Sequence, residues 1–205
     1  IEAATDSDYA KSKLNGETKV RQNFSKSVIL KPSIVYSVDD NFTTNFMTLL
    51  NRLPIFPLYY EGKTKFAPIH CSDLTDVIFN VISNNVNSKI IECVGPEIIS
   101  FKEILEKLLN LIGKKRLLIP MPLPIAQISA RFFEIMPKPL LTRDQLKLLK
   151  YDNVLSGKYK SNSDIGVPSL RYFDDEVKKY CYMWREGGQF STEKYNSDNI
   201  NIKTN

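Results

Sequence analysis

The run from Val28 to Tyr36 does most to limit what this chain can fold into. It reads Val-Ile-Leu-Lys-Pro-Ser-Ile-Val-Tyr, and its apolar and β-branched residues are typical of a strand. A nearly continuous apolar run of this kind suits a buried position in a parallel sheet. Helical patterns flank it, one from Asp8 to about Phe24 and another from Asn41 to Leu53. The sequence therefore predicts a buried parallel strand between two helices.

Further strands and a further helix are predicted in the middle of the chain. The segment from Pro54 to Tyr60 is expected to be extended, and Ile90 to Val94 is expected to be a strand. Between them, Ser72 or Asp73 is the predicted cap of a helix that runs to about Ser83. Its apolar spacing predicts an inward face made of Leu74, Val77, Ile78, Val81 and Ile82.

A capped helix and a long apolar stretch follow. Ser100, with Glu103 three residues later, has the capping-box pattern and predicts the start of a helix that ends at Gly113. The stretch from Leu117 to Leu141 is the most apolar in the chain, but its prolines break any helix that could span a membrane. It contains a helical apolar stripe: Ile125, Ile128, Phe132, Phe133 and Met136. We expect this stripe to pack in a core or lid; the alternative is docking to a membrane or partner subunit.

Tyr9 and Lys13 form a Tyr-x-x-x-Lys pair on the first predicted helix. Residues four apart on a helix lie on the same face, one above the other. A phenol is a weak acid, with an unperturbed pKa of about 10, and a nearby ammonium group favours its ionised form. The pair is therefore a candidate proton donor and acceptor. The spacing alone, however, favours an ordinary exposed helix face, because structural charges outnumber catalytic ones.

The order of these segments resembles the extended and atypical short-chain dehydrogenases/reductases, the NAD-dependent epimerase/dehydratase family. In that family, the helix with Tyr-x-x-x-Lys is followed by a strand that ends in a phrase such as Leu-Arg-Pro-x-x-Val-Tyr-Gly. Here the phrase is Leu30-Lys31-Pro32-Ser33-Ile34-Val35-Tyr36-Ser37. Lys31 and Ser37 depart from the family's Arg and Gly, so the contacts of this loop are less firmly implied than the pair on the helix.

Later phrases carry the resemblance to about residue 173. Residues 64–74 look like the family's strand-to-helix step, in which His70 is expected to be structural and Asp73 a helix cap. Residues 90–97 look like its late strand and Gly-Pro-Glu turn, and 100–105 like the next helix start. The phrases at 141–149 and 152–154 are similar to the subgroup that includes the accessory dehydrogenase-like subunit of respiratory complex I.

The resemblance implies a fold and a domain organisation. The fold is α/β: the C-terminal part of a Rossmann-like, doubly wound parallel sheet plus a small substrate-binding lobe. Residues 1–186 are assigned to this NAD(P)-binding domain, with the substrate lobe mainly from 37–66 and 96–175. Residues 187–205 are polar and without pattern, and we expect a disordered tail.

The resemblance also implies roles for individual residues. Tyr9 is expected to exchange a proton with a hydroxyl or carbonyl oxygen of the substrate. Lys13 is expected to favour the phenolate and to hydrogen-bond the nicotinamide ribose. The backbone of Pro32, Ser33 and Ile34 matches positions that line the nicotinamide, although a plain strand end explains each of these residues as well. The implied cofactor is NAD or NADP.

No glycine-rich phosphate loop is present in the sequence. The glycines lie at 16, 62, 95, 113, 157, 166, 187 and 188, too far apart for the cradle that begins a dinucleotide fold. The family's third catalytic residue, a Ser or Thr, should precede Ile1. We therefore expect this chain to be the C-terminal part of a longer protein, to need the missing part for cofactor binding and to be inactive alone.

Charge and cysteine content limit the classes of ligand and partner that we expect. The formal net charge of +5 is spread along the chain, with one dense patch at Lys114-Lys115-Arg116, so we expect no binding of nucleic acid. A structural zinc site needs four ligands that come together, and the three cysteines are far apart with no Cys-x-x-Cys pair, so we expect no metal. The cysteine usage suits a reducing cytoplasm, and the resemblance adds a place at the periphery of the inner membrane.

Two classes of function remain open from the sequence. The first is an NAD(P)-dependent oxidoreductase or epimerase-like enzyme that transfers hydride to or from a nicotinamide cofactor and acts on an unknown small molecule. The second is a non-catalytic, nucleotide-binding accessory or assembly factor of respiratory complex I or of quinone metabolism. The intact Tyr-Lys pair favours the first, and the subgroup phrases favour the second. The sequence does not identify the substrate.

Overall fold

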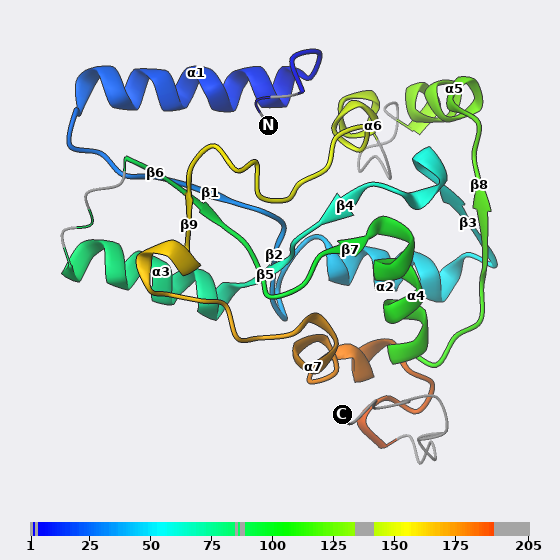
Figure 1. Ribbon diagram of the computed structural model, residues 1–205. Helices are drawn as coiled ribbons and strands as arrows, with labels where there is room; N and C mark the ends of the chain where they lie inside the picture. Colours follow the sequence, from blue (N-terminus) through cyan, green and yellow to red (C-terminus); the bar gives the residue numbers. More distant parts are fainter. Residues whose placement is uncertain (1, 3, 85, 87–88, 134–141, 191–205) are drawn as a thin grey trace.

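The computed structural model describes residues 2, 4–84, 86, 89–133 and 142–190. A parallel sheet of short strands, in the order β1–β6–β9, lies between α1 (Asp8–Asn23) and α3 (Cys71–Ser83), which are on opposite sides of it in Figure 1. The strands of this sheet are β1 (Ile29–Pro32), β6 (Ile90–Cys93) and β9 (Lys160–Ser161). The predicted α/β class with parallel strands is confirmed.

Smaller sheets and helices build the rest of the described chain. Two parallel pairs are β2 (Val35–Tyr36) with β5 (Ile69–His70) and β3 (Ile55–Leu58) with β8 (Leu117–Pro120). One antiparallel pair is β4 (Lys65–Phe66) with β7 (Ile99–Ser100). The other helices are α2 (Thr43–Arg52), α4 (Phe101–Leu111), α5 (Leu123–Phe133), α6 (Arg143–Leu148) and α7 (Phe173–Val177). The 3₁₀ turns are η1 (Tyr59–Gly62), η2 (Ser163–Ile165), η3 (Cys181–Trp184) and η4 (Gly188–Phe190).

The predicted single strand from Val28 to Tyr36 is wrong in one respect, because the segment forms two strands with different partners. The backbone N–H of Ser33 still donates to the carbonyl of Cys93, 2.9 Å away, in line with β6. The next carbonyl, that of Ile34, instead accepts from the N–H of Ile69 at 2.9 Å. The chain thus moves from β6 to β5 between two neighbouring residues, a change that apolar periodicity alone does not reveal.

The larger apolar core lies around α4. The predicted capping box is confirmed: Ser100 Oγ accepts from the Glu103 N–H at 3.2 Å, and the Glu103 carboxylate accepts from the Ser100 N–H at 2.7 Å. α4 buries Phe101, Ile104, Leu105, Leu108 and Leu109. These side chains belong to one cluster with Met47 and Leu50 of α2 and Phe173 and Val177 of α7. Apolar burial from three helices therefore fixes the lobe on this side of the molecule.

A smaller core joins α3 to the parallel sheet. Val77 is fully buried and clusters with Ile69, Ile91 and Cys93. The prediction that Ile78 and Ile82 face inward is wrong, since they expose 41% and 74% of their surface. At about 100° per residue, both positions lie well round the helix from Val77. Only one face of α3 meets the sheet.

The segment from Pro54 to Tyr60 is extended only as far as Leu58. Tyr60 and Glu61 then adopt left-handed conformations, with φ of 50° and 58°, and Gly62 follows at 69°. The predicted extension of the last two residues is therefore wrong. A Cβ on Gly62 would lie 2.7 Å from the Cβ of Lys102, so this turn is closed against α4.

The apolar stripe predicted within residues 117–141 is only partly described. Ile125 and Ile128 lie on α5 and are 54% and 72% exposed, so the packing expected in a core or lid is not seen for these two residues. The side chains of Phe132, Phe133 and Met136 lie outside the described residues. Among the described helices, none combines the length and apolar character needed to cross a membrane. Of the predicted tail, residues 187–190 are described and the remainder lies outside the described residues.

Candidate functional site

The helix that carries Tyr9 is fixed at its first turn by polar contacts. Ser7 is the N-cap, and its Oγ accepts from the Ala10 N–H at 3.2 Å. The carboxylate of Asp144, on α6, accepts from the Ser7 hydroxyl and from the backbone N–H groups of Asp8 and Tyr9 at 2.8–3.1 Å. Burial alone would raise the pKa of Asp144, but these donors outweigh it and hold the pKa below its usual value.

Tyr9 and Lys13 lie together on the open side of α1. The ammonium of Lys13 is 5.4 Å from the centroid of the Tyr9 ring, within the range of a cation–π contact. Lys13 is exposed, and Tyr9 is 49% exposed. In all of α1, Ala10 is the one buried residue that the structure describes. The predicted pair is thus preassembled and accessible to a ligand.

The predicted cofactor-lining residues lie where β1 gives way to β2. Pro32 is exposed at the end of β1, and Ile34 is partly buried. Ser33 is buried, and its Oγ donates to the carbonyl of Asn153 at 2.7 Å and accepts from the Ala67 N–H at 3.2 Å. The hydroxyl of Ser33 therefore already forms hydrogen bonds within the protein, so any contact of Ser33 with a cofactor would come from its backbone.

A half-buried ion cluster fastens α1 to the sheet. Lys31 Nζ is 2.9 Å from a carboxylate oxygen of Glu17 on α1, and it also pairs with Glu2. The ammonium lies 4.9 Å from the ring centroid of Tyr159. Burial lowers the pKa of Lys31, but hydrogen bonds to the two glutamates outweigh this and raise it overall. Lys31 thus has a structural role.

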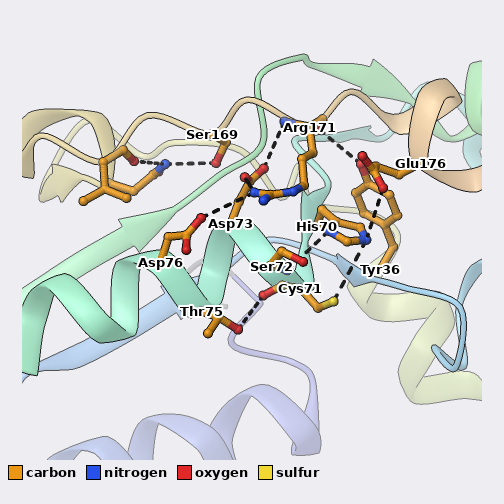
Figure 2. Close-up of polar contacts among 12 residues, drawn as sticks. Tyr36, His70, Cys71, Ser72, Asp73, Thr75, Asp76, Ser169, Arg171 and Glu176 are labelled. Carbon is orange, nitrogen blue, oxygen red and sulfur yellow. Dashed lines mark hydrogen bonds and ion pairs between the residues drawn. The ribbon is translucent and has the colours of Figure 1, made fainter.

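The His-x-x-Asp phrase is a structural junction between α3 and the segment before α7 (Figure 2). The predicted cap at Ser72 or Asp73 is wrong: His70 is the N-cap of α3, and its Nδ1 accepts from the Ser72 N–H at 3.3 Å. Asp73 is buried in the first turn of α3, and its carboxylate forms an ion pair with the guanidinium of Arg171. The same carboxylate accepts a hydrogen bond from the backbone N–H of Arg171 at 3.2 Å. A buried carboxylate needs such a partner, which the sequence places almost a hundred residues away.

Aromatic and acidic groups surround His70. Its Nε2 lies 3.8 Å from Glu176 Oε2 and 4.0 Å from Cys71 Sγ, and the Tyr36 ring packs against the imidazole edge at 5.3 Å between centroids (Figure 2). Burial is the main cause that lowers the pKa of His70, while Glu176 opposes it. The imidazole is therefore a neutral cap at pH 7, in line with the expected structural role.

Two hollows of the structure lie away from the predicted pair. One, of about 310 Å³, lies between the end of α1 and the start of β1, lined by Arg21, Ser27 and Lys89 among others. Another, of about 280 Å³, lies beyond β6 between Gly95, Leu155 and Ser169. No group of three or more metal-ligand side chains gathers within the described residues. Tyr9 and Lys13 line neither hollow, and both side chains are exposed.

Sequence relatives point to one respiratory subunit. No known protein-family profile matches the chain. NADH dehydrogenase (ubiquinone) 1 alpha subcomplex subunit 9, mitochondrial, of Dictyostelium discoideum is 25% identical over 90% of this chain and 52% of its own length. The protein of the same name from Arabidopsis thaliana is 22% identical over 87% and 47%, and that from Mus musculus is 26% identical over 77% and 42%. The chain spans about half the length of these relatives.

Solved structures with the same fold include enzymes that are named for nucleotide sugars. A dTDP-glucose 4,6-dehydratase from Streptomyces venezuelae, with NAD bound, gives a TM-score of 0.56 at 16% identity over 86% of this chain and 50% of its own. A UDP-N-acetylglucosamine 4-epimerase from Bacillus cereus gives 0.52 at 12% identity, over 87% and 55%. RMD from Pseudomonas aeruginosa, complexed with NADPH, gives 0.52 at 9% identity, over 86% and 54%.

The chain shares the fold of these dehydratase and epimerase structures and is similar in sequence to a mitochondrial NADH dehydrogenase subunit. The sequence predicted the pair of Tyr9 and Lys13 but not the groups that hold their helix. The Asp144 contact with α1 and the Lys31 cluster join segments that are far apart in the chain. The sequence did contain a signal for the Asp144 contact, because Asp144 lies within residues 141–149, which resemble the complex I subgroup.

Proposed function

We propose that the protein containing this chain binds a nicotinamide dinucleotide and uses Tyr9 and Lys13 as the acid/base pair of an oxidoreductase or epimerase-like reaction. The observation that carries the proposal is the pair itself: an exposed phenol with an ammonium 5.4 Å from its ring, on the first helix of a dehydrogenase-like fold. Because the relatives are about twice as long as this chain, the proposal concerns the full-length protein.

The residues present fit part of a dinucleotide site. Tyr9 and Lys13 are accessible, and Pro32 is exposed at the end of a parallel strand, the usual place for ligands in such sheets. The glycine-rich cradle for the pyrophosphate is not in this sequence. The chain would therefore supply the nicotinamide end of the site, and the pyrophosphate would be held by residues outside it.

The chemistry of this chain's own groups follows from their placement. A bound nicotinamide would give or take the hydride. The Tyr9 hydroxyl would then donate or accept the proton at the substrate oxygen that gains or loses it. Lys13 would hydrogen-bond the cofactor ribose. Ser33 would hold the strand end in place rather than touch the cofactor, because its hydroxyl is occupied.

The first test measures the binding of NADH and NADPH to the full-length protein by fluorescence. This chain alone is measured in parallel. We expect binding by the full-length protein only. If the full-length protein binds neither nucleotide, the proposed cofactor site is wrong. Comparison of NADH with NADPH also decides which dinucleotide is preferred.

The second test is the Tyr9→Phe variant of the full-length protein. We expect turnover to fall at least about a hundred-fold while cofactor affinity stays within about two-fold, because the change removes a proton and little binding surface. Tyr182→Phe, a partly exposed tyrosine of η3, is the matched control and should keep its activity. Unchanged turnover in Tyr9→Phe would rule this residue out as the acid/base.

A second candidate function is an accessory or assembly role in respiratory complex I without turnover. The names of the sequence relatives favour it. On α5, Leu123, Ile125 and Ile128 are 40–72% exposed and form a candidate contact surface for a partner subunit or the inner-membrane surface. Under this role, the full-length protein would bind nucleotide, oxidise none and co-purify with respiratory subunits. Loss of that co-purification in Ile128→Glu, but not in Lys115→Glu, would support it.

A further inference from the structure

Residues 142–153 include most of the segments that resemble the complex I subgroup, and the proposed reaction gives them no role. They nevertheless contact both the start of α1, which carries Tyr9, and the end of β1, which leads to Ser33. This segment begins with a capping box, in which Thr142 Oγ1 accepts from the Gln145 N–H at 3.1 Å, and continues through α6. It ends in an extended segment whose residue Asn153 forms a bridge with Phe66. We refer to residues 142–153 as the strap.

The first end of the strap holds the turn that carries Tyr9. Asp144 accepts hydrogen bonds from the hydroxyl of Ser7 and from the N–H groups of Asp8 and Tyr9. The N–H groups of Asp8 and Tyr9 are helix N-terminal donors that the helix itself cannot satisfy. An aspartate accepts their hydrogen bonds and complements the positive end of the helix dipole. Lys147 adds a bond from its ammonium to the Asp6 carbonyl at 2.8 Å.

The second end of the strap holds the strand end that carries Ser33. The carbonyl of Asn153 accepts from Ser33 Oγ at 2.7 Å and from the Ala67 N–H at 3.2 Å. The Asn153 N–H donates to the Lys65 carbonyl at 2.7 Å, and Asp152 accepts from the Lys65 N–H at 2.8 Å. Asn153 is thus fixed to the start of β4 and to the junction of β1 and β2 at once.

The middle of the strap is packed rather than free. Leu146 is buried in a cluster with Tyr59 and Ala126, and the carbonyl of Leu149 accepts a bond from Thr64 Oγ1. Movement of either end is therefore resisted by the lobe. No hydrogen bond or ion pair within the described residues joins Tyr9 or Lys13 directly to residues 32–34. Besides the ion pair between Lys31 and Glu17, the strap is a further polar connection between α1 and this strand end on the described chain.

We propose that the strap keeps the Tyr9 helix and the Ser33 strand end in register with each other, and that Asp144 is the positioning residue for Tyr9. The proposal rests on the proposed function for its effect on cofactor binding, and on geometry alone for its effect on α1. Asp144 acts through the backbone of Asp8 and Tyr9 and contacts no reacting atom.

The test compares Asp144→Ala and Asp144→Asn in the full-length protein, with Asp164→Asn as the matched control. Asp164 accepts the N–H and hydroxyl of Ser161 at 2.8 Å in η2, outside the strap. Hydrogen exchange is measured at the amides of residues 8–10, and NADH and NADPH affinity by fluorescence. Ser33→Ala, which removes the bond to Asn153, tests the other end if the Asp144 variants fold poorly.

We expect Asp144→Ala to raise exchange at residues 8–10 and to weaken dinucleotide binding, each by roughly ten-fold, since it removes three bonds to a charged acceptor. Asp144→Asn keeps one acceptor oxygen and should give an intermediate effect. Asp164→Asn should change neither quantity by more than about two-fold. Ser33→Ala should weaken binding without changing exchange at residues 8–10.

Two outcomes would overturn the proposal. Exchange at residues 8–10 that is the same in Asp144→Ala and wild type would show that the strap does not hold α1. Raised exchange with an affinity no weaker than that of Asp164→Asn would show that the contact is structural only. If the wild type binds no dinucleotide, the proposed function fails, and the exchange measurement still decides whether the strap holds the helix.

Discussion

The helices α1 and α4 are held to this molecule in opposite ways. α4 buries five side chains in the main core, whereas the longer α1 buries only Ala10. What fixes α1 is polar: Asp144 at its first turn and Lys31 against Glu17 further along. Apolar burial therefore defines the lobe, while hydrogen bonds and ion pairs set the position of the candidate catalytic face. That arrangement leaves Tyr9 and Lys13 uncovered for a ligand.

The largest effect on stability should come from α4. Leu108→Ala removes a fully buried side chain from the main core and should lower the free energy of unfolding by about 3 kcal/mol, because it leaves a cavity. The matched change on α1 is Leu14→Ala, at a partly buried position, which should cost less than about 1 kcal/mol. Urea unfolding of both variants measures the contrast. Equal losses would mean that α1 is held by apolar packing after all.

An intermediate effect is expected from the ion cluster beneath α1. Lys31→Met leaves the carboxylates of Glu2 and Glu17 half-buried without their cation, and should cost about 1–2 kcal/mol in unfolding free energy. Lys26→Met, at an exposed lysine, is the control and should be neutral. Hydrogen exchange should rise along α1 in the first variant and stay unchanged in α4. An equal rise in hydrogen exchange in α1 and α4 would contradict the conclusion that polar contacts hold α1 while apolar burial holds α4.

The smallest effect concerns pH and the cap of α3. Since the pKa of His70 is lowered in the folded state, folding favours the neutral imidazole. Its contribution to stability is complete above the ordinary histidine pKa of about 6.5 and is lost as pH falls towards the lowered value. The free energy of unfolding should therefore decline between pH 7.5 and 5.5.

The variant His70→Asn provides the comparison for this decline. Asparagine is a good N-cap that does not titrate, and the chain has no other histidine, so the variant should have a flatter profile over the same range. Identical slopes in the two proteins, measured by urea unfolding at each pH, would remove His70 as the cause.

Much of the fold followed from local signals. The capping box at Ser100 and Glu103 is a property of a short window of sequence, and this prediction was confirmed. The break at Ser33 was missed because it reflects a change of partner strand. The exposure of Ile78 and Ile82 was missed because apolar residues on a helix do not reveal how many of its faces have a neighbour.

In the candidate site too, local contacts were predictable from the sequence and long-range contacts were not. Tyr9 and Lys13 are close because of helix geometry, so their spacing alone predicted the contact. Their roles in catalysis and those of Pro32, Ser33 and Ile34 stay predictions. Long-range pairs such as Asp73 with Arg171 have no local signature. A buried carboxylate predicts that some partner exists, but a single sequence does not say which.

The contact between Asn153 and its neighbours has a consequence for how this protein can change over generations. Its bonds to Ser33, Lys65 and Ala67 all use the main-chain atoms of Asn153. Any residue with a free N–H could make them, provided that it arrives at the same point in space. Substitution at 153 should thus be tolerated, whereas insertion or deletion of a single residue between 144 and 153 should not. Lineages carrying this fold should then differ here in composition and agree in length.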